Sequence, residues 1–597
     1  MKPIYHSYSA WRRALSSLPQ AGCVLALAAL SAGCTQNDLG DGFSGGGSKP
    51  GSFVTLSLTT PSAPAMRSNP TGGEQGDGTE TGQDYENTVK RAVAFFYQGS
   101  GVNAEGTTRI QAAVPFTFTG NGTEGSNGID RVYTTTPQTV DLENGTYHLL
   151  LVANPGTDWW SGKSLTLGDV RDHIQQQAWQ QAEDGSSYSD FVMTSAADAT
   201  VTLNFNPEND PAKATVSVER MAARLDYQAE ASYTCQDSLY SGATAEITGA
   251  ALVNNLTAGS YLTKRVANDV DGTGLSYLGD ETADAGVQTN YVLDPWTAQK
   301  TAGNNSFTIG DATAQPASSL YGVWFDDGSS DDPNQWADPN QWASYVKAGT
   351  SVSDGSETWQ RIGYTLENTT AATEAGSRYS TGVVFKAQFH PQGLPNYTDG
   401  ATFFSYGTNL YASMEDMMQH FYGSVFADDF SKVTSCQTWG AVKAFIASTL
   451  LPNDPSGYYT WLSKQAEGKA DDDVADAQSL TWDRYMLTEC GYSKSADGAV
   501  TLDQNGKVTR TALRPTGVRT YENATCYYTW WVRHSNDGHD DTNGIMEYAI
   551  VRNNIYKLKV NSIYSLGSDI PTDEDHGLVI EVYVNDWQLL DPETLPM

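Results

Sequence analysis

Short segments in which apolar and polar residues alternate recur along this chain of 597 residues, and turn residues separate them. In the first, 53–58, Val54, Leu56 and Leu58 fall on one face. A period of two puts every second side chain on the same face of a strand, so each such segment is predicted to be a half-buried strand. Further segments with strand signals occur at 89–97, 115–118, 139–142, 147–153, 201–205, 216–227, 245–254, 291–293, 363–366, 381–389, 527–532, 555–560 and 578–587. Strand after short strand predicts an all-β chain built from β-sandwiches.

Two regions depart from this alternation. Residues 170–181 have the spacing of a helix, and so do apolar residues from Met414 to Leu450. We therefore predict a helical insertion over about 395–500 in the second of two β-sandwich domains. The length alone is compatible with two to four domains.

The charge of the chain argues against nucleic acid as a partner. Seventy acidic and 35 basic residues give a net charge of −35, and phosphates would repel such a chain. A hydrophobic fraction of 39% nevertheless supplies enough apolar surface for a folded core.

The amino terminus carries the features of an export signal. Three basic residues precede a short apolar run at 23–30 (CVLALAAL), which is too short to span a bilayer. Residues 30–34 (LSAGC) resemble a bacterial lipobox, in which Cys34 would be the first mature residue and would carry the lipid, such as palmitate. The alternative is an ordinary signal peptide. Removal of residues 1–33 would take away three basic and no acidic residues, so the mature chain would carry −38.

No motif in the sequence predicts catalysis, a cofactor or a metal. Acidic stretches at 326–332, 471–473 and 536–541 lack the spacing of a calcium loop and are interpreted as solvated loops. Four cysteines remain after export and lipidation, and they show no zinc spacing. Trp336 and Trp342, in a duplicated loop, are the pair that we expect to be exposed and able to stack on a sugar ring.

Several segments resemble the fimbrillins, the pilin subunits of type V pili of Bacteroides-type bacteria, and most closely the major subunits of short (minor) fimbriae. The resemblance runs from about residue 50 to the end. The segments that carry it are 142–156 (LENGTYHLLLVANPG), 218–225 (VERMAARL), 364–370 (YTLENTT), 383–387 (VVFKA), 548–560 (YAIVRNNIYKLKV) and 578–587 (LVIEVYVNDW).

This resemblance implies two tandem transthyretin-like β-sandwich domains and export through the periplasm to the outer membrane as a lipoprotein. It also implies assembly by strand exchange: an arginine-specific protease removes the first strand, and a strand of a neighbouring subunit takes its place. The matching bond here lies between Arg67 and Ser68. Independently, Arg67 lies in a proline- and glycine-rich stretch, 59–84, which is the kind of exposed loop that proteases cut.

The segment 578–587 is the predicted donor strand. Leu578, Ile580, Val582 and Val584 alternate with more polar positions, and the polar loop 567–577 precedes them. Loss of Val54, Leu56 and Leu58 with the first strand would leave sites that such a row of aliphatic side chains fills. The alternative interpretation is that this strand completes its own domain.

The predicted organisation is a signal peptide at 1–33, a propeptide at 34–67, an N-terminal domain at 68–222, a C-terminal domain at 223–577 and a donor strand at 578–597. The predicted function is a non-enzymatic fimbrial shaft subunit for cell adhesion, with other pilin, tip or anchor subunits as partners at the cell surface. The alternatives are a tip or accessory adhesin that donates no strand, and a glycan-binding lipoprotein that does not polymerise.

Overall fold

The structure is a computed structural model. It describes residues 51–59, 79–118, 123–124, 131–182, 187–278, 283–284, 287–288, 291–301, 306–307, 315–316, 345–354, 357–374, 376, 379–413, 416–417, 420, 432–448, 457–481, 484–485, 492–494, 500–502, 518–535, 543–544, 546–572 and 577–588.

A first β-sandwich encloses a core to which strands far apart in the sequence contribute. Its strands follow the order β4-β3-β8-β12-β14-β1-β6-β5, with β13 paired to β8 and β7 paired to β1. Leu56, Phe96, Leu149 and Val216 come from four of these strands and are all buried in that core. The strands are β1 (Ser52–Thr59), β3 (Arg91–Tyr97), β4 (Ala112–Thr117), β5 (Thr123–Glu124), β6 (Arg131–Thr134), β7 (Gln138–Val140), β8 (Gly145–Ala153), β12 (Met193–Ser195), β13 (Ala199–Leu203) and β14 (Ala212–Arg220).

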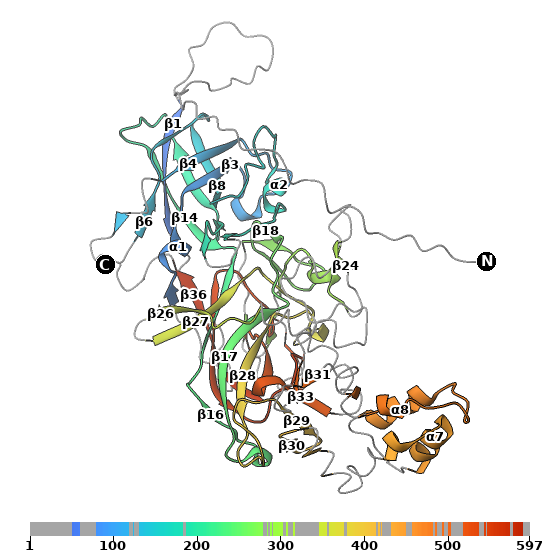
Figure 1. Cartoon of the computed structure of the whole chain (residues 1–597). Helices are drawn as coiled ribbons and strands as arrows, with labels where there is room; N and C mark the ends of the chain where they lie inside the picture. The colour runs from blue at the N-terminus through green and yellow to red at the C-terminus, as the bar shows by residue number, and fades with distance from the viewer. Residues whose placement is uncertain are drawn as a thin grey trace, which may run out of the picture. The chain divides into compact units, whose positions relative to one another are not determined.

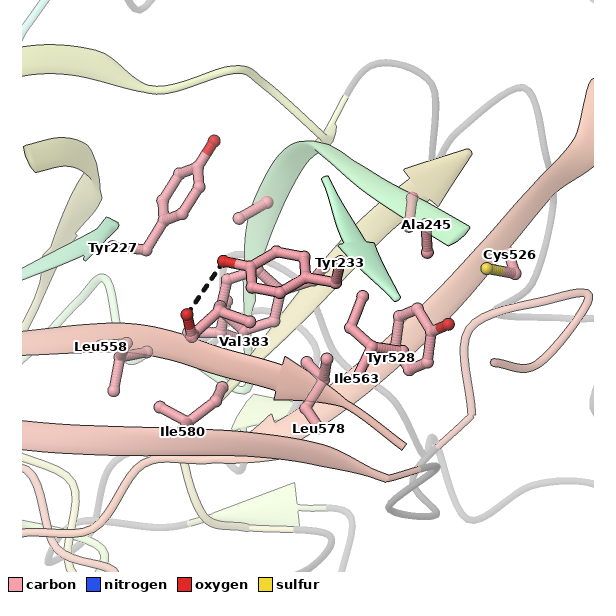
Figure 2. Packing of buried hydrophobic residues seen from close by; sticks show 14 of the residues in the cluster. Tyr227, Tyr233, Ala245, Val383, Cys526, Tyr528, Leu558, Ile563, Leu578 and Ile580 are labelled. Carbon is pink, nitrogen blue, oxygen red and sulfur yellow. Dashed lines mark hydrogen bonds between the residues drawn. The ribbon is translucent and has the colours of Figure 1, made fainter. Parts of the chain in front are cut away.

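A second β-sandwich is built from a six-stranded sheet, β2-β36-β35-β15-β27-β26, and a four-stranded sheet, β16-β17-β28-β34 (Figure 1). Leu558 and Ile580 of the first sheet share one core with Val383 and Tyr528 of the second (Figure 2). The strands are β2 (Thr79–Thr81), β15 (Ala223–Gln228), β16 (Tyr233–Thr234), β17 (Thr244–Val253), β26 (Thr350–Asp354), β27 (Glu357–Thr365), β28 (Gly382–His390), β34 (Thr525–Trp531), β35 (Asn554–Ile563) and β36 (Leu578–Gln588).

Short elements connect the strands of the two sandwiches. The helix α1 precedes β3, and α2 begins at a capping box in which Thr166 and Asp169 bond each other's backbone N–H groups. These elements are α1 (Asp84–Asn87), α2 (Leu167–Arg171), β9 (Ile174–Gln175), β10 (Gln180–Gln181), β11 (Tyr188–Ser189), β18 (Ser260–Tyr261), β19 (Arg265–Ala267), β20 (Ser276–Tyr277), β21 (Ala283–Asp284), β22 (Val287–Gln288), β23 (Tyr291–Val292), β24 (Ser306–Phe307) and β25 (Gln315–Pro316).

The predicted insertion has its own small core. Helices α7 (Trp439–Ser448) and α8 (Tyr458–Ala466) pack together, and Val442 and Leu462 are buried between them and their neighbours. The other elements here are β29 (Phe403–Tyr406), β30 (Asn409–Tyr411), β31 (Tyr492–Lys494) and β32 (Val500–Leu502). After the insertion, β33 (Val518–Tyr521) pairs with β29.

The structure confirms the predicted fold class: a mostly-β chain of two sandwiches with helices inserted in the second. The helix expected over 170–181 is wrong in extent, because α2 ends at Arg171 and Ile174–Gln175 pairs with β18 instead.

Two placements differ from the predicted domain limits. β2 lies in the C-terminal sheet rather than in the N-terminal domain, and β36 lies inside that sheet rather than after it. Alternation indicates that a segment is a strand, whereas its sheet is decided by which distant strand it pairs with.

Neighbouring residues of β36 test this burial. Ile580 is 8% exposed and faces the core, whereas Val579 is 48% exposed on the opposite face. We expect Ile580→Ala to lower the free energy of unfolding by about 2–4 kcal/mol through lost burial and a new cavity. Val579→Ala should change it by less than about 0.5 kcal/mol. Urea denaturation of both variants measures the difference, and equal effects would contradict the placement of β36 in the core.

Candidate functional site

The first described strand, β1, is hydrogen-bonded along both of its edges. On one edge it runs parallel to β14, with Val54–Thr59 opposite Ala212–Ser217. On the other edge it is antiparallel to β7 and then to β6. Leu56 adds a further pair of bonds, because its N–H donates to Thr135 Oγ1 and its carbonyl accepts from Thr135 N–H, each at 2.9 Å. This strand is therefore an interior strand of its sheet.

Three side chains of β1 are inserted in the core. Val54, Leu56 and Leu58 are 0%, 0% and 1% exposed. Burial of one such side chain contributes about 1.5–3 kcal/mol. Removal of β1 would expose three apolar sites between two rows of unpaired backbone groups. A sheet in that state binds another extended strand with the same alternation.

The candidate donor strand, β36, carries the matching pattern at the other end of the chain. Leu578, Ile580, Val582 and Val584 are all buried, and Figure 2 shows Leu578 beside Ile563 of β35. β36 pairs antiparallel with β35 from Leu578 to Asp586. In this structure the strand completes its own sheet, so donation to a neighbour would require it to leave that sheet.

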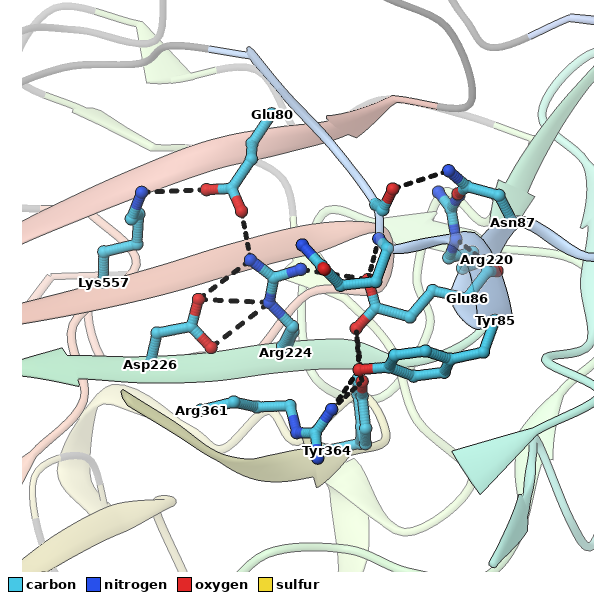
Figure 3. Close-up of polar contacts among 12 residues, drawn as sticks. Glu80, Tyr85, Glu86, Asn87, Arg220, Arg224, Asp226, Arg361, Tyr364 and Lys557 are labelled. Carbon is cyan, nitrogen blue, oxygen red and sulfur yellow. Dashed lines mark hydrogen bonds and ion pairs between the residues drawn. The ribbon is translucent and has the colours of Figure 1, made fainter. Parts of the chain in front are cut away.

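A buried cluster of charges lies on the opposite face of this sheet, and we call its five residues the Arg224 cluster: Glu80, Glu86, Arg224, Asp226 and Lys557 (Figure 3). Every member is at most 4% exposed. The guanidinium of Arg224 donates to all three carboxylates, at 3.0 Å to Glu86 and 2.9 Å to Asp226. Lys557 Nζ donates to the second oxygen of Glu80 at 2.9 Å.

The cluster contains three carboxylates and two cations, so loss of either cation would leave buried carboxylates without a counter-charge. Burial, opposed by Arg224 and assisted by Glu80, raises the pKa of Asp226 to about 6. Burial by itself would lower the pKa of Arg224, but Asp226, Glu86 and Glu80 outweigh it and raise that pKa. The guanidinium is therefore always charged.

Two aromatic hydroxyls and a second arginine extend the cluster. Tyr364 of β27 donates to Glu86, and Arg361 donates to Tyr85. Burial raises the pKa of Tyr85 to about 12, so its hydroxyl keeps its proton. These contacts tie α1 to β27 as well as to β15.

The residues predicted for lipidation, processing and glycan contact, Cys34, Arg67, Ser68, Trp336 and Trp342, lie outside the described residues. The structure brings the removable-strand residues together on one face of β1, and the donor-strand residues on one face of β36. These are separate cores in this structure.

Sequence reasoning did not predict the Arg224 cluster. A signal for it was present, because Arg224 and Asp226 are two residues apart in a strand pattern and so fall on one face. Charges at such positions in an otherwise apolar strand need buried partners. Glu80, a partner of Arg224, lies 144 residues away from it, and no local pattern connects the two.

Within the described ranges, no helix is long and apolar enough to cross a membrane. In the same part of the chain, no three His, Cys, Asp or Glu side chains are grouped so that they would hold a metal ion.

Residues 519–593 match the family described as major fimbrial subunit protein type IV, fimbrillin, C-terminal. The chain carries a fimbrillin C-terminal region. This region includes β34, β35 and β36, and it confirms the resemblance to the fimbrillins. No curated protein matches the chain.

Solved structures with some likeness to this chain include a putative cell adhesion protein from Parabacteroides distasonis, at 13% identity and a TM-score of 0.36, covering 90% of this chain and 99% of the other. A fimbrilin from Porphyromonas gingivalis is 12% identical, with a TM-score of 0.32, and the match covers 90% of this chain and 99% of the other. The tip fimbrial protein Mfa3 from Porphyromonas gingivalis, with a C-terminal truncation, is 9% identical, with a TM-score of 0.29, and the match covers 90% of this chain and 100% of the other. These TM-scores are low, so the likeness to the fimbrillins rests on the match over residues 519–593.

The Arg224 cluster leads to a prediction about stability. Arg224→Met leaves three buried carboxylates without their main cation, so we expect a loss of about 3–5 kcal/mol in the free energy of unfolding. Arg91→Met is the control, because Arg91 also pairs with a carboxylate, Asp158 at 2.5 Å, but at the surface. It should cost less than about 1 kcal/mol. Chemical denaturation of both variants checks this, and a loss from Arg224→Met as small as the control's would contradict it.

Proposed function

We propose that this fimbrillin is a subunit of an adhesive surface fimbrium. It is exported as a lipoprotein through Cys34, cut after Arg67, and polymerised when a strand of another subunit replaces β1. The family match at 519–593 supports a structural role in fimbriae rather than an enzymatic one. The observation that carries the mechanism is the position of β1, whose two edges are paired and whose three aliphatic side chains are buried.

The position of β1 in the chain agrees with this mechanism. Residues 60–78, which contain Arg67, separate β1 from β2, so a single cut there would disconnect β1 from the rest of the fold. The excised strand could then be replaced by a strand of another subunit that pairs with β14 on one edge and with β7 and β6 on the other.

Processing is tested by substitution of the arginine. Arg67→Ala should stay monomeric on treatment with an arginine-specific protease, whereas the unchanged protein should form ladders on gels. Arg109→Ala replaces an exposed arginine elsewhere and should behave as the unchanged protein. Amino-terminal sequencing of the cut chain should begin at Ser68. Ladders from Arg67→Ala would contradict the proposal.

A tip or accessory subunit that accepts a strand and donates none is the second candidate function. One observation favours it: β36 completes its own sheet, with four aliphatic side chains in the core. A subunit that keeps β36 in place would have no strand to give. Trp336 and Trp342 as a sugar-binding pair stay a prediction.

A peptide competition distinguishes donor from non-donor. If β36 is the donor, a synthetic peptide of residues 578–588 should enter the vacated groove of cut protein and shorten the ladders. The control is the same peptide with Ile580 and Val582 replaced by Asp. It should not shorten the ladders, because its charges cannot be buried in the groove. A chain that ends at Gly577 should also fail to form ladders. Ladders that persist in both experiments would assign strand donation to another segment.

A further inference from the structure

We propose that residues 79–87, which we call the edge segment, hold the candidate donor strand in its own sheet through Glu80, and that cleavage after Arg67 weakens this hold. The proposal rests on the proposed function for the role of β36. The hold itself is a property of the uncut monomer.

The edge segment begins with β2, which is the outermost strand of the six-stranded sheet. β2 runs parallel to the carboxyl-terminal end of β36, with Thr79–Thr81 opposite Asp586–Gln588. Three residues make few backbone hydrogen bonds, and a strand this short does not hold itself at an edge. Side-chain contacts must therefore fix its position.

Glu80 makes these contacts across β36. The order of strands is β2-β36-β35-β15, so β36 lies between Glu80 and both of its cationic partners. Lys557 is on β35 and Arg224 is on β15. The Glu80 carboxylate binds both, and Figure 3 shows it directed toward them. The side chains of Glu80, Lys557 and Arg224 thus bridge one face of β36, while the core covers its other face.

The other end of the edge segment is fixed on the same sheet. Glu86 is fully buried, and it accepts from Arg224 at 3.0 Å and from the hydroxyl of Tyr364. Asn87 accepts from Arg220, and the side chain of Glu86 also accepts from Gln83 N–H at 2.6 Å. β36 cannot move out past β2 unless the Glu80 contacts break.

The cut after Arg67 changes the support of this segment. Before cleavage, β1 in the first sandwich and α1 anchor the chain on both sides of β2. After cleavage the chain would begin at Ser68, eleven residues before Thr79, and β2 would be close to a free end. Segments near a free end open more often. One cut would therefore both empty the β1 groove and weaken the hold on β36.

Hydrogen exchange in the uncut chain tests the hold without any need for polymerisation. In Glu80→Gln we expect the amides of 578–588 to exchange about tenfold faster or more, while those of 52–59 keep their rate. Glu581→Gln, the same substitution on β36 itself, is the matched control and should leave both rates unchanged. Unchanged exchange at 578–588 in Glu80→Gln, or an equal increase in the control, would overturn the proposal.

A second variant covers the case in which Glu80→Gln loosens the whole chain. Lys557→Gln removes one partner of Glu80 and leaves its contact with Arg224, so the same local increase is expected at 578–588. If Lys557→Gln also raised the exchange rates of 52–59 and 578–588 equally, the proposed hold would be overturned. In the wild type, cleavage should raise exchange at 578–588, and no rise would overturn the link to Arg67. Faster exchange in Glu80→Gln, combined with cut protein that forms no ladders, would leave the hold standing and refute the polymerisation function.

Discussion

A strand inside a sheet needs hydrogen-bond partners for its backbone on both edges, and this constraint governs the behaviour of β1 and β36. β1 has β14 on one side and β7 with β6 on the other, so its loss cannot be repaired by a small local shift. The groove that remains must take up a strand or stay exposed. An edge-to-edge ladder with buried aliphatic side chains is also the kind of contact that does not dissociate easily, as a fibre requires.

The same constraint opposes release of β36 from its own sheet in the uncut chain. It has β35 along one edge and β2 at the end of the other, one face in an apolar core and the other beside the Arg224 cluster. Buried ion pairs contribute little net stability, but breaking one by removal of a partner is costly. A cluster of this type therefore adds little net stability, but it opposes the separation of the segments that carry its charges.

Much of the architecture could be predicted from the sequence. The alternation at 53–58 and 578–587 predicted two strands with one apolar face each, and both faces are buried. The helix at Trp439–Ser448 followed from its apolar spacing. The helix at 170–181 was overextended, because short helical spacing does not exclude a two-residue strand that pairs with Ser260–Tyr261.

Alone, the sequence determined that segments such as 53–58 and 578–587 are strands, and which of their faces are apolar. Only the tertiary structure decided that β2 covers the edge of β36 and that Glu80 meets Arg224 and Lys557. The reason is physical. Side-chain alternation is a local property of the backbone, whereas strand neighbours and buried charge partners are chosen by the packing of residues that lie hundreds of positions apart.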